Sequence, residues 1–200
     1  MASIIKTSAV SVLTLQSVAA STVLKSSDIS VPPQLAATML IHFGRRAATA
    51  AGAGVNFRVE VSSETSGDGS WVPLAILTTD FVACEAEAAT GTNASGQAVI
   101  TVASTTNLTA GDIVFMDNTT ITNSEWGRIK SISAGVSITL EDNLTNAQST
   151  GASTIYDRAE MYAVQLDLTA AKRLRLVVDG SLFTQAFAVR ARLITGDSIS

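Results

Sequence analysis

Apolar and polar residues alternate with a period of two along much of this chain. From Val55 to Val61 every odd position is apolar and every even position is polar. This alternation is the signature of a β-strand with one face in a core and the other face in water. By this pattern we expect strands near residues 8–16, 36–43, 55–63, 71–78 and 80–84. Helix signals are scarce, since only residues 33–38 and 85–89 could each hold a single turn.

The middle of the chain differs in composition and in the length of its predicted strands. Two small polar stretches, residues 88–96 and 146–152, have the composition of linkers. Between them the pattern predicts short strands at residues 98–102, 112–116, 127–132 and 136–140. This succession is typical of a small β-barrel, with a long hairpin extension of the main sheet as the alternative.

Three further strands are expected after the second polar stretch, at residues 161–168, 173–178 and 186–194. Three strands can hardly bury an apolar face alone, so we expect them to complete the sheets begun by residues 1–85. The sequence therefore predicts an all-β fold, an antiparallel β-sandwich of the jelly-roll or Ig-like kind that is split in sequence. Its parts are residues 1–85 and 155–200, with residues 86–154 inserted as a small β-barrel-like subdomain. The shared core is expected to contain Phe57, Val59, Val61, Leu174, Leu176 and Val178.

The N-terminal segment allows two interpretations. Residues 9–20, which follow Lys6, could pass for a weak secretory signal. Serine and threonine interrupt their apolar positions, however, and this favours a strand. An unpaired strand of this kind would aggregate, so we expect a sheet of its own or of an adjacent subunit to order it. Lys6, Val10 and Val12 are accordingly candidates for an assembly contact.

Composition narrows the possible functions. The chain is 46% hydrophobic and 15% charged, which is typical of a folded protein. Its net charge of −4 argues against a nucleic-acid partner, because phosphate binding needs clustered lysine and arginine. No apolar run approaches the ~20 residues that span a bilayer, so no membrane partner is expected. The acidic residues match no calcium-binding loop, and we expect no metal and no cofactor.

Nucleophilic chemistry has little support. Cys84 is the single cysteine, which excludes an internal disulfide, and we expect it to be a small buried residue. His42 is the single histidine and lies far from Cys84 in the sequence. A Cys–His pair is conceivable in space, but the chain carries no local signature of one. No catalytic residue is therefore assigned, and an enzyme is the least favoured class.

Four arginines alternate with apolar residues on the last two predicted strands: Arg173, Arg175, Arg190 and Arg192. If these strands pair, the four guanidinium groups share one face. That face is either simply solvated or a charge-complementary contact with acidic residues of a neighbouring subunit, since arginine is favoured at interfaces.

The two tryptophans are candidates for a ligand platform. Trp71 begins a predicted strand, and Trp126 follows Glu125. An exposed indole could stack on a sugar, whereas a tryptophan among apolar strand residues belongs to the core.

Taken together, these features resemble the virion structural proteins of tailed bacteriophages. The resemblance is carried by the Ser/Thr/Ala-rich strands, the near absence of His and Cys, the split sandwich, and the inserted segments Leu108–Phe115 and Glu125-Trp126. It implies a non-enzymatic capsid decoration (cement) protein of the virion. Such a protein binds the major capsid protein or other virion proteins through repeated contacts, as a homo-oligomer. The alternatives are a tail or baseplate component and a carbohydrate-binding or adhesin module.

Overall fold

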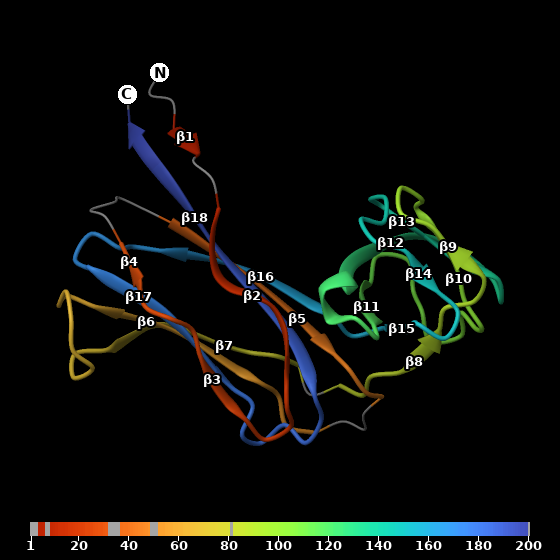
Figure 1. The fold of residues 1–200 in the computed structure, drawn as a ribbon, viewed down its shortest axis with the longest axis horizontal. Coiled ribbons are helices and arrows are strands. Elements are labelled where there is room, and N and C mark those ends of the chain that lie inside the picture. Colours follow the sequence, from red (N-terminus) through yellow and green to blue (C-terminus); the bar gives the residue numbers. More distant parts are fainter. Residues whose placement is uncertain (1–3, 7–8, 32–36, 49–51, 81, 200) are drawn as a thin grey trace.

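The computed structural model describes residues 4–6, 9–31, 37–48, 52–80 and 82–199. Within them the regular elements are strands in antiparallel sheets, together with the 3-10 turn η1 (Ile121–Asn123). The protein is therefore all-β, as predicted. Its strands form two groups (Figure 1). We call the strands before residue 80 and after residue 159 the body, and residues 86–156 the half-barrel.

The body consists of two five-stranded sheets. In sheet I the order is β1-β18-β5-β16, and β2 also pairs with β18; the bounds are β1 (Ile4–Lys6), β2 (Val10–Val18), β5 (Ala37–Arg45), β16 (Glu160–Leu166) and β18 (Phe187–Ile199). In sheet II the order is β3-β17-β6-β7, and β4 also pairs with β17; the bounds are β3 (Val23–Lys25), β4 (Ile29–Ser30), β6 (Asn56–Ser62), β7 (Val72–Thr78) and β17 (Arg173–Asp179).

One hydrophobic cluster joins the two sheets. Phe57 and Val59 of β6 lie opposite Val178 and Leu176 of β17 in sheet II. The same cluster contains Phe43 of sheet I. All six residues of the predicted core belong to this cluster: Phe57, Val59, Leu174, Leu176 and Val178 are fully buried, and Val61 is partly buried against them. The prediction that the N-terminal and C-terminal strands share a core is confirmed.

The half-barrel has a curved six-stranded sheet in the order β10-β13-β12-β11-β15-β8 and a short β14-β9 pair (Figure 1). Their bounds are β8 (Ala86–Ala88), β9 (Thr92–Asn93), β10 (Val99–Thr101), β11 (Ile113–Asn118), β12 (Glu125–Ser133), β13 (Ser137–Leu140), β14 (Gln148–Ser149) and β15 (Ser153–Tyr156). An isolated bridge between Ala89 and Val102 links the two ends of the sheet. The half-barrel has its own hydrophobic cluster, which includes Ile100, Val114 and Ile129.

The polar stretches 88–96 and 146–152 are not linkers. Gln148 and Asn93 are paired residues of β14 and β9, so both stretches are part of the half-barrel. The chain instead passes between body and half-barrel at Glu85 and Asp157. The Glu85 N–H donates to Asp157 Oδ1 at 2.8 Å, which holds the two crossing points together.

Two local predictions are wrong. Residues 80–84 form no strand in their described part, because the backbone groups of Asp80 bind side chains: its carbonyl accepts from Arg45 and its N–H donates to Glu160. Residues 86–88 form strand β8, in place of the helical turn predicted over 85–89, because β15 offers them a ladder partner. The other predicted turn, 33–38, falls mostly on residues 32–36, which lie outside the described residues.

The last two long strands do not pair. β17 lies in sheet II between β6 and the β3/β4 edge, whereas β18 lies in sheet I between β5 and β2. The four arginines therefore do not share one face. Arg173 and Arg175 lie on sheet II, and Arg190 and Arg192 lie on sheet I. Alternation identifies the inner and outer faces of each strand but does not name its neighbour.

The N-terminal strand is ordered by its own chain. β2 runs along β18, and Val12 is buried in the body core, so its side chain is not available for an assembly contact. A shift of register near Ala191 accompanies the two consecutive buried residues Val12 and Leu13, as in a β-bulge. Val10 is 45% exposed. The side chain of Lys6 lies outside the described residues.

Candidate functional site

The half-barrel packs on the outer face of sheet I. Gly44 of β5 lies opposite Ala188 of β18, and both are buried. A Cβ atom on Gly44 would lie 2.3 Å from the ring of Phe115, a residue of the half-barrel strand β11. Only glycine therefore permits this contact. Cys84, Tyr156 and Ala159 complete the small apolar cluster that fills the junction, together with Phe115 and Ala188.

Trp126 anchors the next position along the same face. His42 of β5 and Arg190 of β18 are paired residues there, and both contact the indole. The ring centroids of His42 and Trp126 are 5.3 Å apart in an edge-on arrangement, and the Arg190 guanidinium carbon lies 5.1 Å from the indole centroid. The Trp126 Nε1–H donates to the carbonyl of Phe43 at 2.9 Å. This indole is a structural contact between the two groups of strands.

An ion pair reinforces the junction. Arg46 Nε lies 2.9 Å from Asp117 Oδ1, and Arg46 also donates to the hydroxyl of Ser17 at 2.6 Å. Burial raises the pKa of Asp117, and the Arg46 guanidinium opposes that shift. Arg45, only 1% exposed, donates to the carbonyl of Arg158 and to the carboxylate of Asp80. The two groups of strands are thus held by directed polar contacts as well as by packing.

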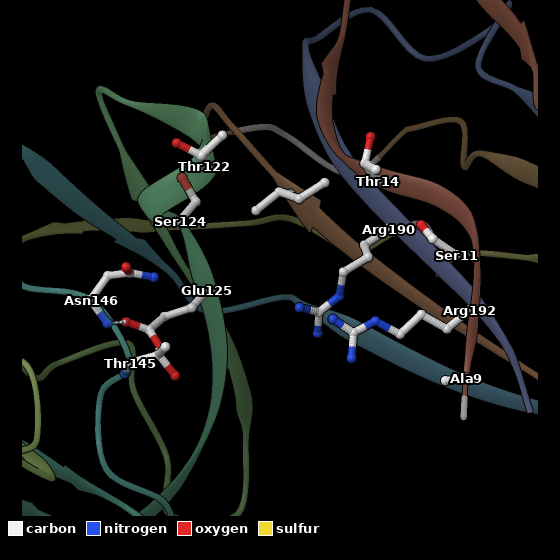
Figure 2. A pocket seen from close by; sticks show the side chains of 11 residues that line it. Ala9, Ser11, Thr14, Thr122, Ser124, Glu125, Thr145, Asn146, Arg190 and Arg192 are labelled. Carbon is white, nitrogen blue, oxygen red and sulfur yellow. Dashed lines mark hydrogen bonds between the residues drawn. The ribbon is translucent and has the colours of Figure 1, made fainter. Parts of the chain in front are cut away.

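Beyond Trp126 the two groups of strands diverge and leave a cleft. Its volume is about 660 Å³. The lining residues are Ala9, Ser11, Thr14, Leu15, Thr122, Ser124, Glu125, Thr145, Asn146, Arg190 and Arg192. Figure 2 shows the guanidinium groups of Arg190 and Arg192 side by side on one wall, with Glu125 on the opposite wall. We call this space the Arg190–Arg192 cleft.

The two arginines of the cleft have no acidic partner in the part of the chain that the structure describes. Arg190 Nη2 lies 2.7 Å from Nδ1 of His42, and Arg190 Nε is buried without a partner. Since arginine can only donate, His42 Nδ1 must be the acceptor. Burial and the charges of both arginines lower the pKa of His42 to about 4. The imidazole is therefore neutral near pH 7 and does not compete for an anion.

The Glu125 carboxylate is held in place by hydrogen bonds within the half-barrel. Its carboxylate oxygens accept from the backbone N–H groups of Thr145 and Asn146 at 2.9 and 3.0 Å. The amide of Gln148 donates to the same carboxylate at 3.0 Å. The Glu125 carboxylate is thus directed toward Thr145 and Asn146 on the half-barrel side of the cleft, and it pairs with neither arginine (Figure 2).

The other arginine pair is neutralised within the chain. Arg175 binds Glu60 at 2.8 Å and Asp68 at 2.9 Å, and Arg173 binds Asp28 at 2.5 Å. Arg173 also donates to the carbonyls of residues 64 and 67, which holds that loop on the sheet. Both guanidinium groups lie over the ring of Trp71, at 4.7 and 4.1 Å from its centroid.

Both predicted platform residues are only partly exposed. Trp71 is covered by two guanidinium groups and donates its Nε1–H to Asp68 at 3.1 Å. Trp126 packs against Phe115, with ring centroids 4.8 Å apart, as well as against His42 and Arg190. The structure thus places the two indoles at separate sites, and neither presents an uncovered ring.

Cys84 is buried, as predicted. Burial and the nearby Asp157 carboxylate raise the pKa of its thiol to about 12, so the sulfur stays protonated near neutral pH. His42 is hydrogen-bonded to Arg190 and packs edge-on against Trp126. Among the described residues no group of three or more His, Cys, Asp or Glu side chains could hold a metal ion.

A second exposed feature lies on sheet II. β7 is the end strand of that sheet, and its outward side chains Val72, Leu74 and Ile76 are 60%, 40% and 61% exposed. Ala75 and Leu77, which alternate with them, pack toward the body core. We call the three outward residues the β7 row.

Sequence reasoning named both cleft arginines but missed the rest of the cleft. Glu125 comes from the half-barrel, and Ser11 and Thr14 come from the N-terminal strand. The alternation around residues 190 and 192 signals an outward polar face. Nothing in the sequence signals that a second group of strands lies opposite that face.

No protein-family model matches the chain, and no curated protein is detectably similar to it in sequence. Over the described residues, no helix has the length and apolar character needed to cross a membrane.

Proposed function

We propose that this chain is a non-enzymatic structural protein of a virion, of the capsid decoration (cement) type. In this proposal it is a homo-oligomer that binds the major capsid protein. Its two sheets form a jelly-roll or Ig-like β-sandwich that the half-barrel, residues 86–156, interrupts as an inserted subdomain. The observation that carries the proposal is the β7 row, an apolar surface on an open strand edge.

An exposed apolar edge is a liability for a protein that stays alone in water. Soluble proteins usually protect end strands with charges, prolines or a covering segment, because an open edge can pair with another chain. β7 carries Pro73 but no charged residue between Val72 and Thr78. Three apolar side chains that are each at least 40% exposed point away from the core on this strand. Such a surface suits burial against a partner protein.

The junction between body and half-barrel supports the same role. A tight glycine contact, an ion pair and the Trp126 hydrogen bond hold the two groups of strands together. A rigid unit can contact a particle at several places at once. In a symmetric shell, weak contacts of this kind add up to lasting attachment. A tail or baseplate component would use the same surfaces, and immunoelectron microscopy of whole particles distinguishes the two locations.

The proposal is tested by the mass of the purified chain in solution and by sedimentation with particles of the phage whose genome encodes it. We expect an oligomer that sediments with the particles. The double variant Val72→Ser/Ile76→Ser removes apolar contact area without touching the core, so it should bind at least about tenfold more weakly.

Leu182→Ser is the matched control, because Leu182 is 72% exposed on the turn that follows β17. It should bind as the wild type does. A monomeric wild type that stays in the supernatant contradicts the proposal. Unchanged binding of the β7 double variant shows that the β7 row is not the contact.

A further inference from the structure

We propose that the Arg190–Arg192 cleft binds a small, singly charged, hydroxyl-bearing acid, that is, an acidic sugar of the uronic acid kind. Its carboxylate would bind the two guanidinium groups, and its hydroxyls would face the polar wall of the half-barrel. This proposal does not rest on the role in a virion.

Charge is the first argument. The guanidinium groups of Arg190 and Arg192 lie side by side in a concave space, and no carboxylate pairs with either one among the described residues. Two like charges this close repel each other, and half-burial of Arg190 strengthens the repulsion. An oxyanion bound between the two guanidinium groups would offset this electrostatic repulsion. The planar donor fork of arginine matches a carboxylate in particular.

The other arginine pair of the chain, by contrast, has acidic partners. Arg173 and Arg175 have the same spacing on their strand, yet three carboxylates of the same chain neutralise them: Asp28, Glu60 and Asp68. Among the described residues, the chain thus supplies acidic partners for one arginine pair and none for the pair in the cleft. An unneutralised pair is the one suited to an external anion.

Glu125 limits the charge of the ligand. Its carboxylate lies on the wall opposite the arginines and is fixed by two backbone N–H groups and the Gln148 amide. The lining therefore carries two positive charges and one negative charge. A single carboxylate on the arginine side fits this arrangement. A run of acidic side chains from another protein would bring like charge against Glu125.

The remaining lining suits hydroxyl groups. The side-chain hydroxyls of Ser11, Thr14, Thr122 and Thr145 and the amide of Asn146 have no side-chain partner within the described part of the chain. Leu15 and Ala9 are the only apolar residues among those that line the cleft. A volume of about 660 Å³ falls in the usual range for small-molecule sites. A polar ligand of sugar size is therefore favoured over an apolar one.

The arginine wall is also preorganised. Trp126 packs against both His42 and Arg190, and the neutral His42 accepts a hydrogen bond from Arg190. These contacts fix the guanidinium of Arg190 before any ligand arrives, which lowers the entropic cost of binding. They also place two NMR reporters beside the site: the indole N–H of Trp126 and the ring protons of His42, the single histidine of the chain.

The test is an NMR titration of the full chain with D-glucuronate in the millimolar range. The neutral control ligand is methyl D-glucuronate, the methyl ester, which keeps the hydroxyls and removes the charge. We expect glucuronate to shift both reporters with saturation, and the ester to bind at least about tenfold more weakly. Arg192→Gln, at an exposed position, should weaken glucuronate binding about tenfold while the rest of the amide spectrum is unchanged.

Arg128→Gln is the matched control variant, because Arg128 is an exposed arginine of the half-barrel outside the cleft. It should bind glucuronate as the wild type does. The absence of a saturable shift, equal binding of the ester, or equal loss in both variants overturns the proposal. Inorganic phosphate that binds as tightly as glucuronate, or a tetra-aspartate peptide that binds more tightly, overturns the assignment to an acidic sugar. None of these outcomes depends on whether the chain binds a capsid.

Discussion

Arg190 donates a hydrogen bond to His42 across sheet I, with 2.7 Å between Nη2 and Nδ1. The bond requires an imidazole whose proton sits on Nε2. Protonation of Nδ1 would remove the acceptor and would add a third positive charge beside Arg190 and Arg192. The hydrogen bond and the lowered pKa of His42 are therefore two consequences of the same arrangement.

The first prediction concerns pH. The pKa of His42 is lowered from 6.5 to about 4, so between these values the unfolded chain binds more protons than the folded chain. The stability contributed by neutral His42 is present above pH 6.5 and is lost as the pH falls through about 4. Its full size is on the order of 3 kcal/mol, because one pKa unit corresponds to about 1.4 kcal/mol. An NMR titration of the histidine ring protons measures the pKa directly.

The matched variant for this prediction is His42→Gln, whose side-chain oxygen can still accept from Arg190. Arg190 and Arg192 are the charged groups that act on His42, while its other neighbours Met161 and Trp126 are neutral. Urea unfolding at pH 7 and pH 5 should show a larger loss of stability for the wild type than for the variant. Equal losses would contradict the prediction.

The second prediction concerns the junction. Gly44→Ala places a methyl group 2.3 Å from the Phe115 ring, so it should destabilise the folded state by about 1–3 kcal/mol or more through overpacking. Gly69→Ala is the control, since nothing lies within 4 Å of its Cβ position. The double variant Gly44→Ala/Phe115→Ala should cost less than the sum of the two single changes. Thermal or urea unfolding of the wild type, the two single variants, the double variant and the Gly69→Ala control measures these changes. Strict additivity would show that the two residues are not in repulsive contact.

The third prediction concerns the body core. Phe57 is fully buried and lies opposite Val178. Phe57→Ala should therefore lower the free energy of unfolding by about 3–5 kcal/mol. Leu182→Ala, at a residue that is 72% exposed, should change it by less than about 0.5 kcal/mol. Similar unfolding midpoints for the two variants would argue against a shared core at this position.

The fourth prediction concerns the half-barrel. The Glu85 N–H and the Asp157 carboxylate are hydrogen-bonded, so a short Gly-Ser loop can replace residues 86–156 without moving the body. We expect the shortened chain to fold, with a lower melting temperature because the contacts of Phe115 and Trp126 with sheet I are lost. Circular dichroism and thermal unfolding report both results. A molten or insoluble product would mean that the body needs the half-barrel in order to fold.

Alternation along the chain was enough to predict most of the long strands and the core. Phe57, Val59, Leu174, Leu176 and Val178 could be assigned to the interior because side chains of a strand alternate between its two faces. Short strands such as β9 and β14 could not be predicted, because a strand of two residues shows no detectable alternation. Their small polar composition is the same as that of a linker.

Strand partners were decided by tertiary structure alone. Arg173 and Arg190 follow the same local pattern, yet β17 and β18 lie in different sheets, so one arginine meets Asp28 and the other faces the cleft. The cleft itself joins β2, β18 and the half-barrel, which are far apart in sequence. A local pattern records which face of a strand is buried. The group that lies opposite an outward face depends on long-range packing, and here that packing includes the contact between Gly44 and Phe115 and the hydrogen bond from Trp126 to Phe43.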